Sequence, residues 1–346
     1  CFFLFEQRRK LNFHDYFLIA TLLVLLLSTF INWNNKSLNY IFAYLYTFIF
    51  LYKNIDLLSY QIKLINLLKY NALGILISAA FSCIEFFSFF ILKYKISDLL
   101  PRYKEASATY SEGINRSYGF ATEPTTLALY FNILGPFAIL YWYRNKSRKR
   151  TVIYTIILIL GWFFTFSASA MLFLISSIVF VYIISYRLKF LFLITKNIIK
   201  LSILFYAFFI LFKGGIMDKI IGKILLKDGG TSSSQRFDVF QLAIQRFIEN
   251  PLLGLGLGFT SSINEMSPIN WYLVLATNGG IFALIFMLIF NFLNLKISLK
   301  LRDRYGLLPA IGFTCAIFGF LTTSIFFIPF FWIALIFINK MKYTYD

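Results

Sequence analysis

The sequence predicts an all-α protein, a polytopic transmembrane helical bundle of about ten spans. Hydrophobic residues make up 59% of the chain, charged residues only 14%, and the mean hydropathy is +0.74. A soluble domain carries roughly a quarter charged residues, so this chain cannot cover a water-facing surface. Apolar runs of about 20 residues, enough to cross a ~30 Å hydrocarbon core, recur along it.

The predicted spans are separated by two long polar segments, 93–121 and 214–268. The apolar stretch 151–186 would be about 54 Å long as one helix, so we split it into two spans at "FSASA". The stretch 306–339 is likewise expected to fold back near "TTS" as two spans. The remaining spans are predicted at 14–32, 38–52, 71–92, 122–143, 198–213 and 270–292.

Two further segments flank these spans. "KNIDLLSYQIKLINLLKY", residues 53–70, has the pattern of an amphipathic helix at the membrane interface. The opening "CFFLFEQRRK" has the pattern of an apolar span followed by a basic stop. It predicts that the chain is N-terminally truncated, with one or more helices before Cys1.

The positions of Lys and Arg orient the bundle. "RNKSRKR", residues 144–150, has five basic residues and no acidic one, so it is expected in the cytoplasm. Counting spans outward from it places 93–121 and 214–268, where acidic and basic residues are mixed, outside the cytoplasm. The cytoplasmic side then receives Arg8, Arg9, Lys10, Lys53, Lys63, Lys69, Arg187, Lys189, Lys196, Lys200, Lys296, Lys300, Arg302, Arg304, Lys340 and Lys342.

Nucleic-acid and metal binding are not expected. The formal charge is +18 and 21% of the residues are aromatic, a combination found in single-strand binders. Most of these aromatic residues, however, lie inside the apolar spans. The three cysteines, Cys1, Cys83 and Cys315, form no CxxC pair, so neither a disulfide framework nor a zinc site is supported.

The first polar segment leads into the 122–143 span through "INRSYGFATEPTTLALYF". Arg116 lies seven residues before Glu123, and Pro124 is well placed to open the helix. A carboxylate at a helix N-terminus is favoured by the helix dipole, so Glu123 suits a helix cap. In the alternative, functional interpretation, Arg116 and Glu123 line a polar cavity at the membrane edge.

The second polar segment contains an amphipathic helix, "SSSQRFDVFQLAIQRFIENP", expected to lie on the bundle or at the lipid interface. The serines before Arg236 can cap this helix, and Pro251 ends it. A guanidinium beside a free helix N-terminus suits a phosphate or pyrophosphate, which favours Arg236 as a ligand over the alternative of a lipid-headgroup anchor. For Arg246 a lipid-headgroup anchor is the favoured interpretation, with substrate binding as the alternative.

The glycine run in "IENPLLGLGLGF", residues 248–259, does not match a nucleotide-binding fingerprint. A Walker loop ends in Gly-Lys-Ser/Thr, whereas Gly258 is followed by Phe-Thr, and the dinucleotide motif needs a preceding strand. The segment also lies on the predicted outer side, away from ATP. The glycines are expected to form a tight, flexible return from the amphipathic helix to the membrane edge.

Four stretches together resemble the O-antigen polymerase and ligase superfamily of bacterial membrane glycosyltransferases. They are "RSYGFATEP", "FTFSASA", "RFDVFQLAIQRFIENPLLGLGLGF" and "NWYLVLATNGGIFAL", within roughly 110–290. Each stretch alone is a weak signal, and their order, spacing and sidedness carry the resemblance. Where many relatives have an Arg after the serine of the second stretch, this chain has "SASA".

The resemblance implies a GT-C-like enzyme at the outer face of the bacterial cytoplasmic membrane. Its substrate would be an oligosaccharide linked to undecaprenyl pyrophosphate, with membrane lipid and a chain-length regulator as further partners. It would use no cofactor, neither a nucleotide sugar nor a metal. The pyrophosphate leaving group supplies the energy, so the protein must neutralise that group and position the acceptor hydroxyl.

Carried onto this chain, the resemblance implies that Arg116 and Arg236 are the pyrophosphate ligands and that Asn270, which opens a span, binds substrate. Related ligases have a His beside that Asn, but this chain reads "SPINWY" there and its one histidine is His14. The candidate general bases are therefore Glu265 and Glu123, because a carboxylate can accept the proton of the acceptor hydroxyl.

The sequence favours a polymerase of O-antigen, capsule or exopolysaccharide, with two alternatives. A ligase is less favoured because the His is missing. A flippase of lipid-linked oligosaccharide is less favoured because we detect no internal repeats and few polar residues along the spans. Glu85 in the 71–92 span is the main exception; it is expected either to reach the cavity or to meet a Ser or Tyr.

Overall fold

The computed structural model is helical, with no strand among the residues that it describes. These residues are 12–54, 56, 61–92, 94, 96, 116–186, 231–263, 270–323 and 328–344. The chain divides into two compact units, one of Cys1–Lys69 with Thr231–Asp346 and one of Tyr70–Gly230.

Within the described part of the chain, 5 helices are long and apolar enough to cross a membrane. They confirm the predicted class of an all-α membrane protein. The predicted total of about ten spans stays a prediction, and the span at 198–213 lies outside the described residues. The five helices are α2 (Phe13–Ile31), α5 (Leu64–Leu92), α6 (Pro124–Asn145), α8 (Ala168–Tyr186) and α13 (Trp271–Lys300).

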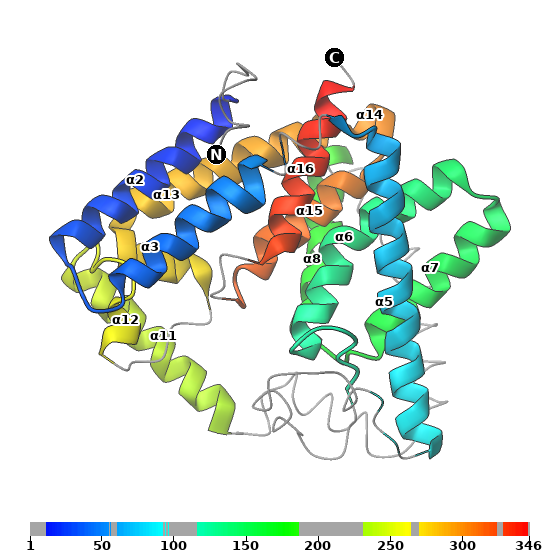
Figure 1. Ribbon diagram of the computed structural model, residues 1–346, viewed down its shortest axis with the longest axis horizontal. Helices are drawn as coiled ribbons and strands as arrows, with labels where there is room; N and C mark the ends of the chain where they lie inside the picture. The colour runs from blue at the N-terminus through cyan, green and yellow to red at the C-terminus, as the bar shows by residue number, and fades with distance from the viewer. Residues whose placement is uncertain are drawn as a thin grey trace. The chain divides into compact units, whose positions relative to one another are not determined.

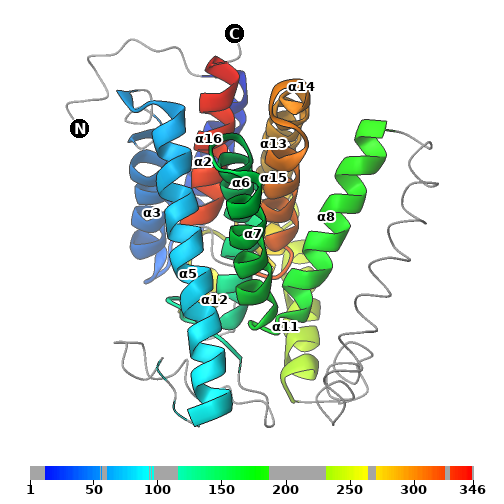
Figure 2. The ribbon, with the colours of Figure 1, turned by 90° about the vertical axis from the view of Figure 1, so that its right-hand side faces the viewer.

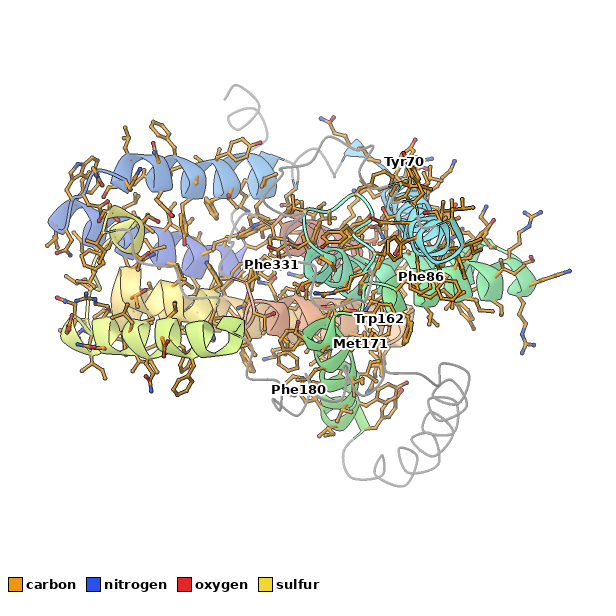
Figure 3. All side chains as sticks on the ribbon, turned by 90° about the horizontal axis from the view of Figure 1, so that it is seen from below. Tyr70, Phe86, Trp162, Met171, Phe180 and Phe331 are labelled. Atoms are coloured by element: carbon orange, nitrogen blue, oxygen red, sulfur yellow. The ribbon has the colours of Figure 1, made fainter. Side chains whose placement is uncertain are left out.

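The first unit is built around α2 and α13, which run side by side (Figure 1). Trp271 at the start of α13 and Trp332 are fully buried, and Phe331 is labelled in the core in Figure 3. The other helices of this unit are α3 (Ser37–Leu45), the π-helix η1 (Tyr46–Asn54), α11 (Thr231–Glu249), α12 (Phe259–Ser262), α14 (Arg302–Tyr305), α15 (Leu308–Gly319) and α16 (Pro329–Tyr343).

Two predicted spans of this unit are subdivided. The span predicted at 38–52 starts as α3 and continues as the π-helix η1, a rare conformation that is usually a single turn. The stretch 306–339 breaks near "TTS" as expected, between α15 and α16. Pro309 and Pro329 each stand in the first turn of these helices, where a missing N–H costs nothing.

The second unit consists of most of α5 together with α6, α7 (Arg148–Phe163) and α8. Figure 2 shows α6 and α7 side by side. The predicted break at "FSASA" is confirmed, because α7 ends at Phe163 and α8 begins at Ala168. Pro124 opens α6, and the Ser147 hydroxyl caps α7 by accepting from Arg150 N at 3.4 Å.

The interfacial segment predicted at 53–70 is partly wrong. Its last residues, from Leu64 onward, form the first turns of α5 rather than a separate helix. No Gly or Pro interrupts "LINLLKYNAL", and Leu, Lys and Ala propagate a helix readily. In this stretch Leu68 is buried while Ile65 and Tyr70 are exposed.

Candidate functional site

The loop 116–119 folds around the carboxylate of Glu85, which projects from α5 and is buried. Glu85 Oε2 accepts hydrogen bonds from the Ser117 hydroxyl at 2.7 Å, from Tyr118 N at 2.9 Å and from Gly119 N at 2.7 Å. Hydrogen bonds to a carboxylate are about twice as strong as neutral ones. Of the two environments expected for Glu85, contact with a serine hydroxyl is the one that the structure shows.

Arg116 joins this loop to the turn between α7 and α8. Its Nε donates to Thr165 O at 3.1 Å, and Ser117 N donates to Phe164 O at 2.9 Å. Farther along, Ser167 Oγ lies 3.4 Å from Thr125 Oγ1 in the first turn of α6. The stretches "RSYGFATEP" and "FTFSASA" are therefore in direct contact, although the residues that join them are about 40 to 50 positions apart.

Aromatic side chains of α5 pack against the loop 116–119 region and the turn between α7 and α8. Phe86 of α5, labelled in Figure 3, stacks on Phe164 with ring centroids 4.1 Å apart. Phe81, on the same helix, stacks on Phe120 at 4.5 Å. Because stacked pairs fix the separation and tilt of their rings, they hold the loop and the turn against α5.

Glu123 occupies the N-cap position of α6, with an extended backbone at φ −138° and ψ 147°. The predicted cap position is therefore confirmed. Within the described part of the chain, however, the carboxylate makes no cap hydrogen bond, and the residue is exposed. An exposed carboxylate at a helix N-terminus can approach a polar ligand at the edge of the helix bundle.

In the first unit, the glycine run forms a compact loop against α13 and the α2–α3 turn. Gly254, Gly256 and Gly258 have φ values of 71°, 80° and 81°, in the left-handed region that favours glycine. Asn32 and Asn34, in the α2–α3 turn, donate side-chain hydrogen bonds to Gly254 O and Leu257 O. Glycine therefore stands at the three positions of this loop where the backbone adopts a positive φ.

The amides of this loop are already hydrogen-bonded to the protein. Leu255 N donates to Thr277 O at 2.8 Å, Gly256 N to Asn278 O at 3.0 Å and Leu257 N to Thr29 Oγ1 at 2.9 Å. A phosphate cradle needs successive amides that are open to the ligand. These amides are therefore not open to a phosphate, and the run forms a tight return that is hydrogen-bonded to α2 and α13.

The loop and α13 approach each other closely at a break in the helix. Gly280 has φ 66° and ψ −166° inside α13, and a Cβ built there would lie 2.1 Å from Leu252 O. A Cβ on Gly254 would lie 2.6 Å from the carbonyl carbon of Asn278. "NPLLGLGLGF" and "TNGG" (277–280) are thus fitted together through their glycines.

The predicted ligands of this unit occupy different environments. The Asn270 side chain caps α13 by accepting from Leu273 N at 3.2 Å. Arg246 Nη1 lies 3.2 Å from Glu249 Oε2, and its guanidinium is 5.9 Å from the ring centroid of Phe259. The prediction that the serines before Arg236 cap α11 is wrong, because the helix already begins at Thr231 and Arg236 stands in its second turn. The side chain of Arg236 lies outside the described residues, as does all of Glu265.

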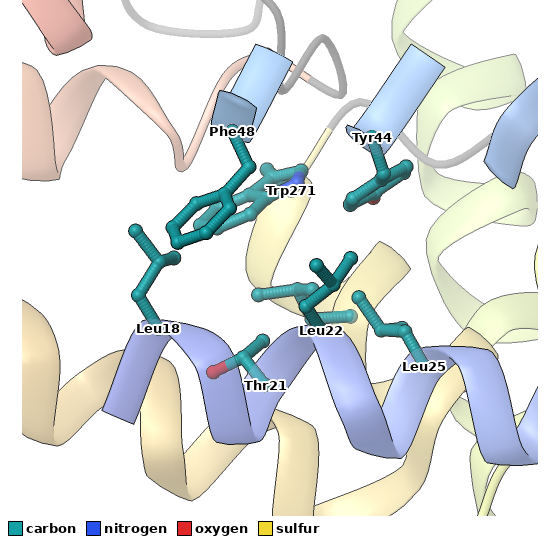
Figure 4. Close-up of a pocket in the computed structure, with 8 residues that line it drawn as sticks. Leu18, Thr21, Leu22, Leu25, Tyr44, Phe48 and Trp271 are labelled. Atoms are coloured by element: carbon teal, nitrogen blue, oxygen red, sulfur yellow. The ribbon is translucent and has the colours of Figure 1, made fainter. Parts of the chain in front are cut away.

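An apolar pocket lies beside the start of α13 (Figure 4). The Trp271 and Tyr44 rings form its upper wall in this view, and the residues from α2 form its lower wall. Its lining is hydrophobic, but its volume of about 10 Å³ has room for no more than about one water molecule, so it holds neither a hydrocarbon chain nor a sugar. The lining includes Leu18, Thr21, Leu25, Phe48 and Leu275.

A buried ionic cluster of the first unit was not predicted. Asp15 in α2 is buried and pairs with Lys53, while the Tyr52 hydroxyl donates to Asp15 Oδ1 at 3.0 Å. The His14 Nε2 is 3.7 Å from the same oxygen. The signal in the sequence is an acid one turn inside an apolar run, with a Lys predicted on the same side of the membrane.

The chain matches none of the known family models, and a comparison with curated proteins finds no match either. The class that the described helices define is that of a helical membrane protein.

Proposed function

We propose that the chain is a polymerase of a surface polysaccharide, namely O-antigen, capsule or exopolysaccharide. It would transfer a growing glycan from undecaprenyl pyrophosphate onto a lipid-linked repeat unit. The reaction would take place at the outer face of the bacterial cytoplasmic membrane, in a bundle of about ten spans. The sidedness rests on the Lys and Arg distribution, which puts 93–121 and 214–268 outside.

The observation that carries the proposal is that the stretches on which the family resemblance rests meet in pairs. Arg116 and its loop contact the "FTFS" turn, and "NPLLGLGLGF" is fitted against "TNGG" of α13. Weak motifs that were scattered by chance would have no reason to form specific contacts in both units. The pairing therefore supports the interpretation of these stretches as one functional pattern.

The proposed chemistry is a single group transfer. The acceptor hydroxyl attacks the anomeric carbon of the donor sugar, and the bond from that carbon to the pyrophosphate oxygen breaks. The pyrophosphate leaves with the bonding electrons, and Arg236 and Arg116 neutralise its charge. The proton of the hydroxyl passes to a carboxylate, for which Glu265 and Glu123 are the candidates.

The contacts of two further predicted ligands, Asn270 and Arg246, bear on this chemistry. Asn270 uses its side-chain oxygen to cap α13, so its amide N–H is the group that it can offer to a sugar hydroxyl. Arg246 is a weaker candidate ligand, because Glu249 already pairs with its guanidinium.

The decisive test is the surface glycan of a deletion strain, separated on a gel. Loss of the ladder with single repeats remaining supports a polymerase. Long chains left on the lipid carrier would instead indicate a ligase, and repeats held in the cytoplasmic leaflet a flippase. Complementation with Arg236→Ala should fail to restore long chains, whereas Gln245→Ala, an exposed position on the same helix, should restore them.

A further inference from the structure

Helix α11 presents three different faces. One face packs on α13 and contains Ala243, which is buried. A second face is polar and exposed, with Asp238, Gln241, Gln245 and Glu249. The third face is apolar and also exposed; its residues, here called the apolar stripe, are Phe237, Phe240, Ile244 and Ile248, which are 60%, 42%, 37% and 67% exposed.

The apolar stripe continues onto a candidate membrane span. Beyond the end of α11, Leu252 is 61% exposed, and Pro251 O accepts from Ile281 N of α13 at 2.8 Å. From that point α13 carries its own row of exposed apolar side chains at three- and four-residue spacing. These are Phe282, Ile285, Leu288 and Phe292.

Helix α13 is long and apolar enough to span the bilayer. Its exposed apolar side chains can therefore face the hydrocarbon of the lipid. We infer that α11 is an interfacial helix, with the apolar stripe inserted at the boundary between acyl chains and headgroups. Such a helix contacts protein, lipid and water on three different sides. In α11 the face with Ala243 contacts protein, the apolar stripe would contact lipid, and the polar face would contact water.

Binding of α11 to the membrane should depend on apolar burial rather than on charge. The water-facing side carries the acidic residues Asp238 and Glu249, and Arg246 is engaged by Glu249 and Phe259. An interfacial helix that relies on anionic lipid carries Lys and Arg on its polar face instead. In the proposed enzyme, and resting on that proposal, the same insertion would hold the Arg236 end of α11 near the depth of a lipid pyrophosphate.

The test uses the full chain without native thiols, Cys1→Ser, Cys83→Ser and Cys315→Ala, reconstituted into phosphatidylcholine vesicles. A bimane label is attached to single cysteines at Phe240 or Ile244 on the apolar stripe. Matched labels go to Gln241 or Gln245, one residue away on the polar face. Lipids with a doxyl quencher near the headgroup should quench the stripe labels several-fold more than the matched labels, with or without added phosphatidylglycerol.

Equal quenching on the two faces would overturn the inference. So would an unquenched label at Ile244 together with disulfide cross-linking of Ile244→Cys between copies, which would mean that a second copy covers the stripe. Quenching that appears only with phosphatidylglycerol would overturn the apolar basis of insertion. The measurement needs no substrate, so its outcome is independent of whether the glycan ladder identifies the chain as a polymerase.

Discussion

Two glycines of the first unit have almost the same backbone conformation but different surroundings. Gly280 has φ 66° and ψ −166°, and Gly306 has φ 70° and ψ −166°. A Cβ on Gly280 would meet Leu252 O at 2.1 Å, whereas a Cβ on Gly306 would meet no described atom within 4 Å. The pair therefore separates the cost of the backbone conformation from the cost of the steric clash.

Gly306→Ala should cost about 1 to 3 kcal/mol, the range for a non-glycine residue in a sparsely populated backbone region. Gly280→Ala should cost more, because the glycine-run loop must also move away from α13. Reversible unfolding in detergent micelles would measure both variants. Equal losses would contradict the close fit between "NPLLGLGLGF" and α13.

The Glu85 carboxylate is the acceptor on which loop 116–119 depends. Glu85→Ala leaves the Ser117 hydroxyl and the amides of Tyr118 and Gly119 without this acceptor, at about 1 to 3 kcal/mol for each group that stays buried and unpaired. Glu85→Gln keeps one oxygen and should lose much less. Thermal unfolding of the purified variants distinguishes them, and a Gln variant as unstable as the Ala variant would contradict the role of the carboxylate as acceptor.

At the scale of elements, the Asp15–Lys53 pair joins α2 to the end of η1. The pair is tied to α16 as well, because Asn339 Nδ2 donates to Tyr52 Oη at 3.2 Å. A π-helix is a rare backbone conformation, so we expect side-chain contacts to contribute to the stability of η1. The ion pair to Asp15 and the hydrogen bonds of the Tyr52 hydroxyl are contacts of this kind.

Lys53→Met should destabilise the first unit by about 3 to 5 kcal/mol, since it leaves the buried Asp15 charge without its partner. The double variant Asp15→Asn with Lys53→Met removes both charges and should recover most of that loss. Tyr52→Phe, which removes one hydrogen bond to Asp15, should cost about 1 kcal/mol. A double-mutant cycle of unfolding free energies measures the coupling, and additive losses would rule out a net contribution from the pair.

Local patterns were enough to predict several elements and were insufficient for others. Pro124 at the start of α6 and the "FSASA" break follow from rules that act within a few residues, and both were predicted. Asn270 was predicted to open a span, but its role as the cap of α13 was not predicted. The π-helix was not predicted, and Tyr52 and Lys53 within it contact Asp15, which is 37 and 38 residues away. A contact between residues so far apart cannot be predicted from local sequence spacing.

At the scale of the whole molecule, the candidate site was predicted as a set of residues but not as an arrangement. Arg116 was selected for its charge beside a predicted span, yet its Nε donates to the backbone oxygen of Thr165, an acceptor that any residue could supply. The glycines of "GLGLG" were recognised as a special backbone, while their fit against α13 depends on Gly280 from another helix. Contacts made through main-chain atoms depend little on which residue occupies the position, so they are difficult to predict from the sequence.

The predicted sidedness of the membrane protein can be tested at exposed positions that the structure describes. Thr122 is the first residue of the predicted span 122–143, at its outer end, and Asn250 belongs to the segment 214–268 predicted outside the cytoplasm. Lys146 and Asp303 lie in connections between spans that are predicted inside it. In the thiol-free chain, single cysteines at Thr122 and Asn250 should react with a membrane-impermeant maleimide on intact cells. Cysteines at Lys146 and Asp303 should react only after permeabilisation, because the basic residues around both turns retain them in the cytoplasm. If Thr122 and Lys146 react together on intact cells, α6 does not separate two compartments, and the outer-face location of Arg116 and Glu123 must be abandoned.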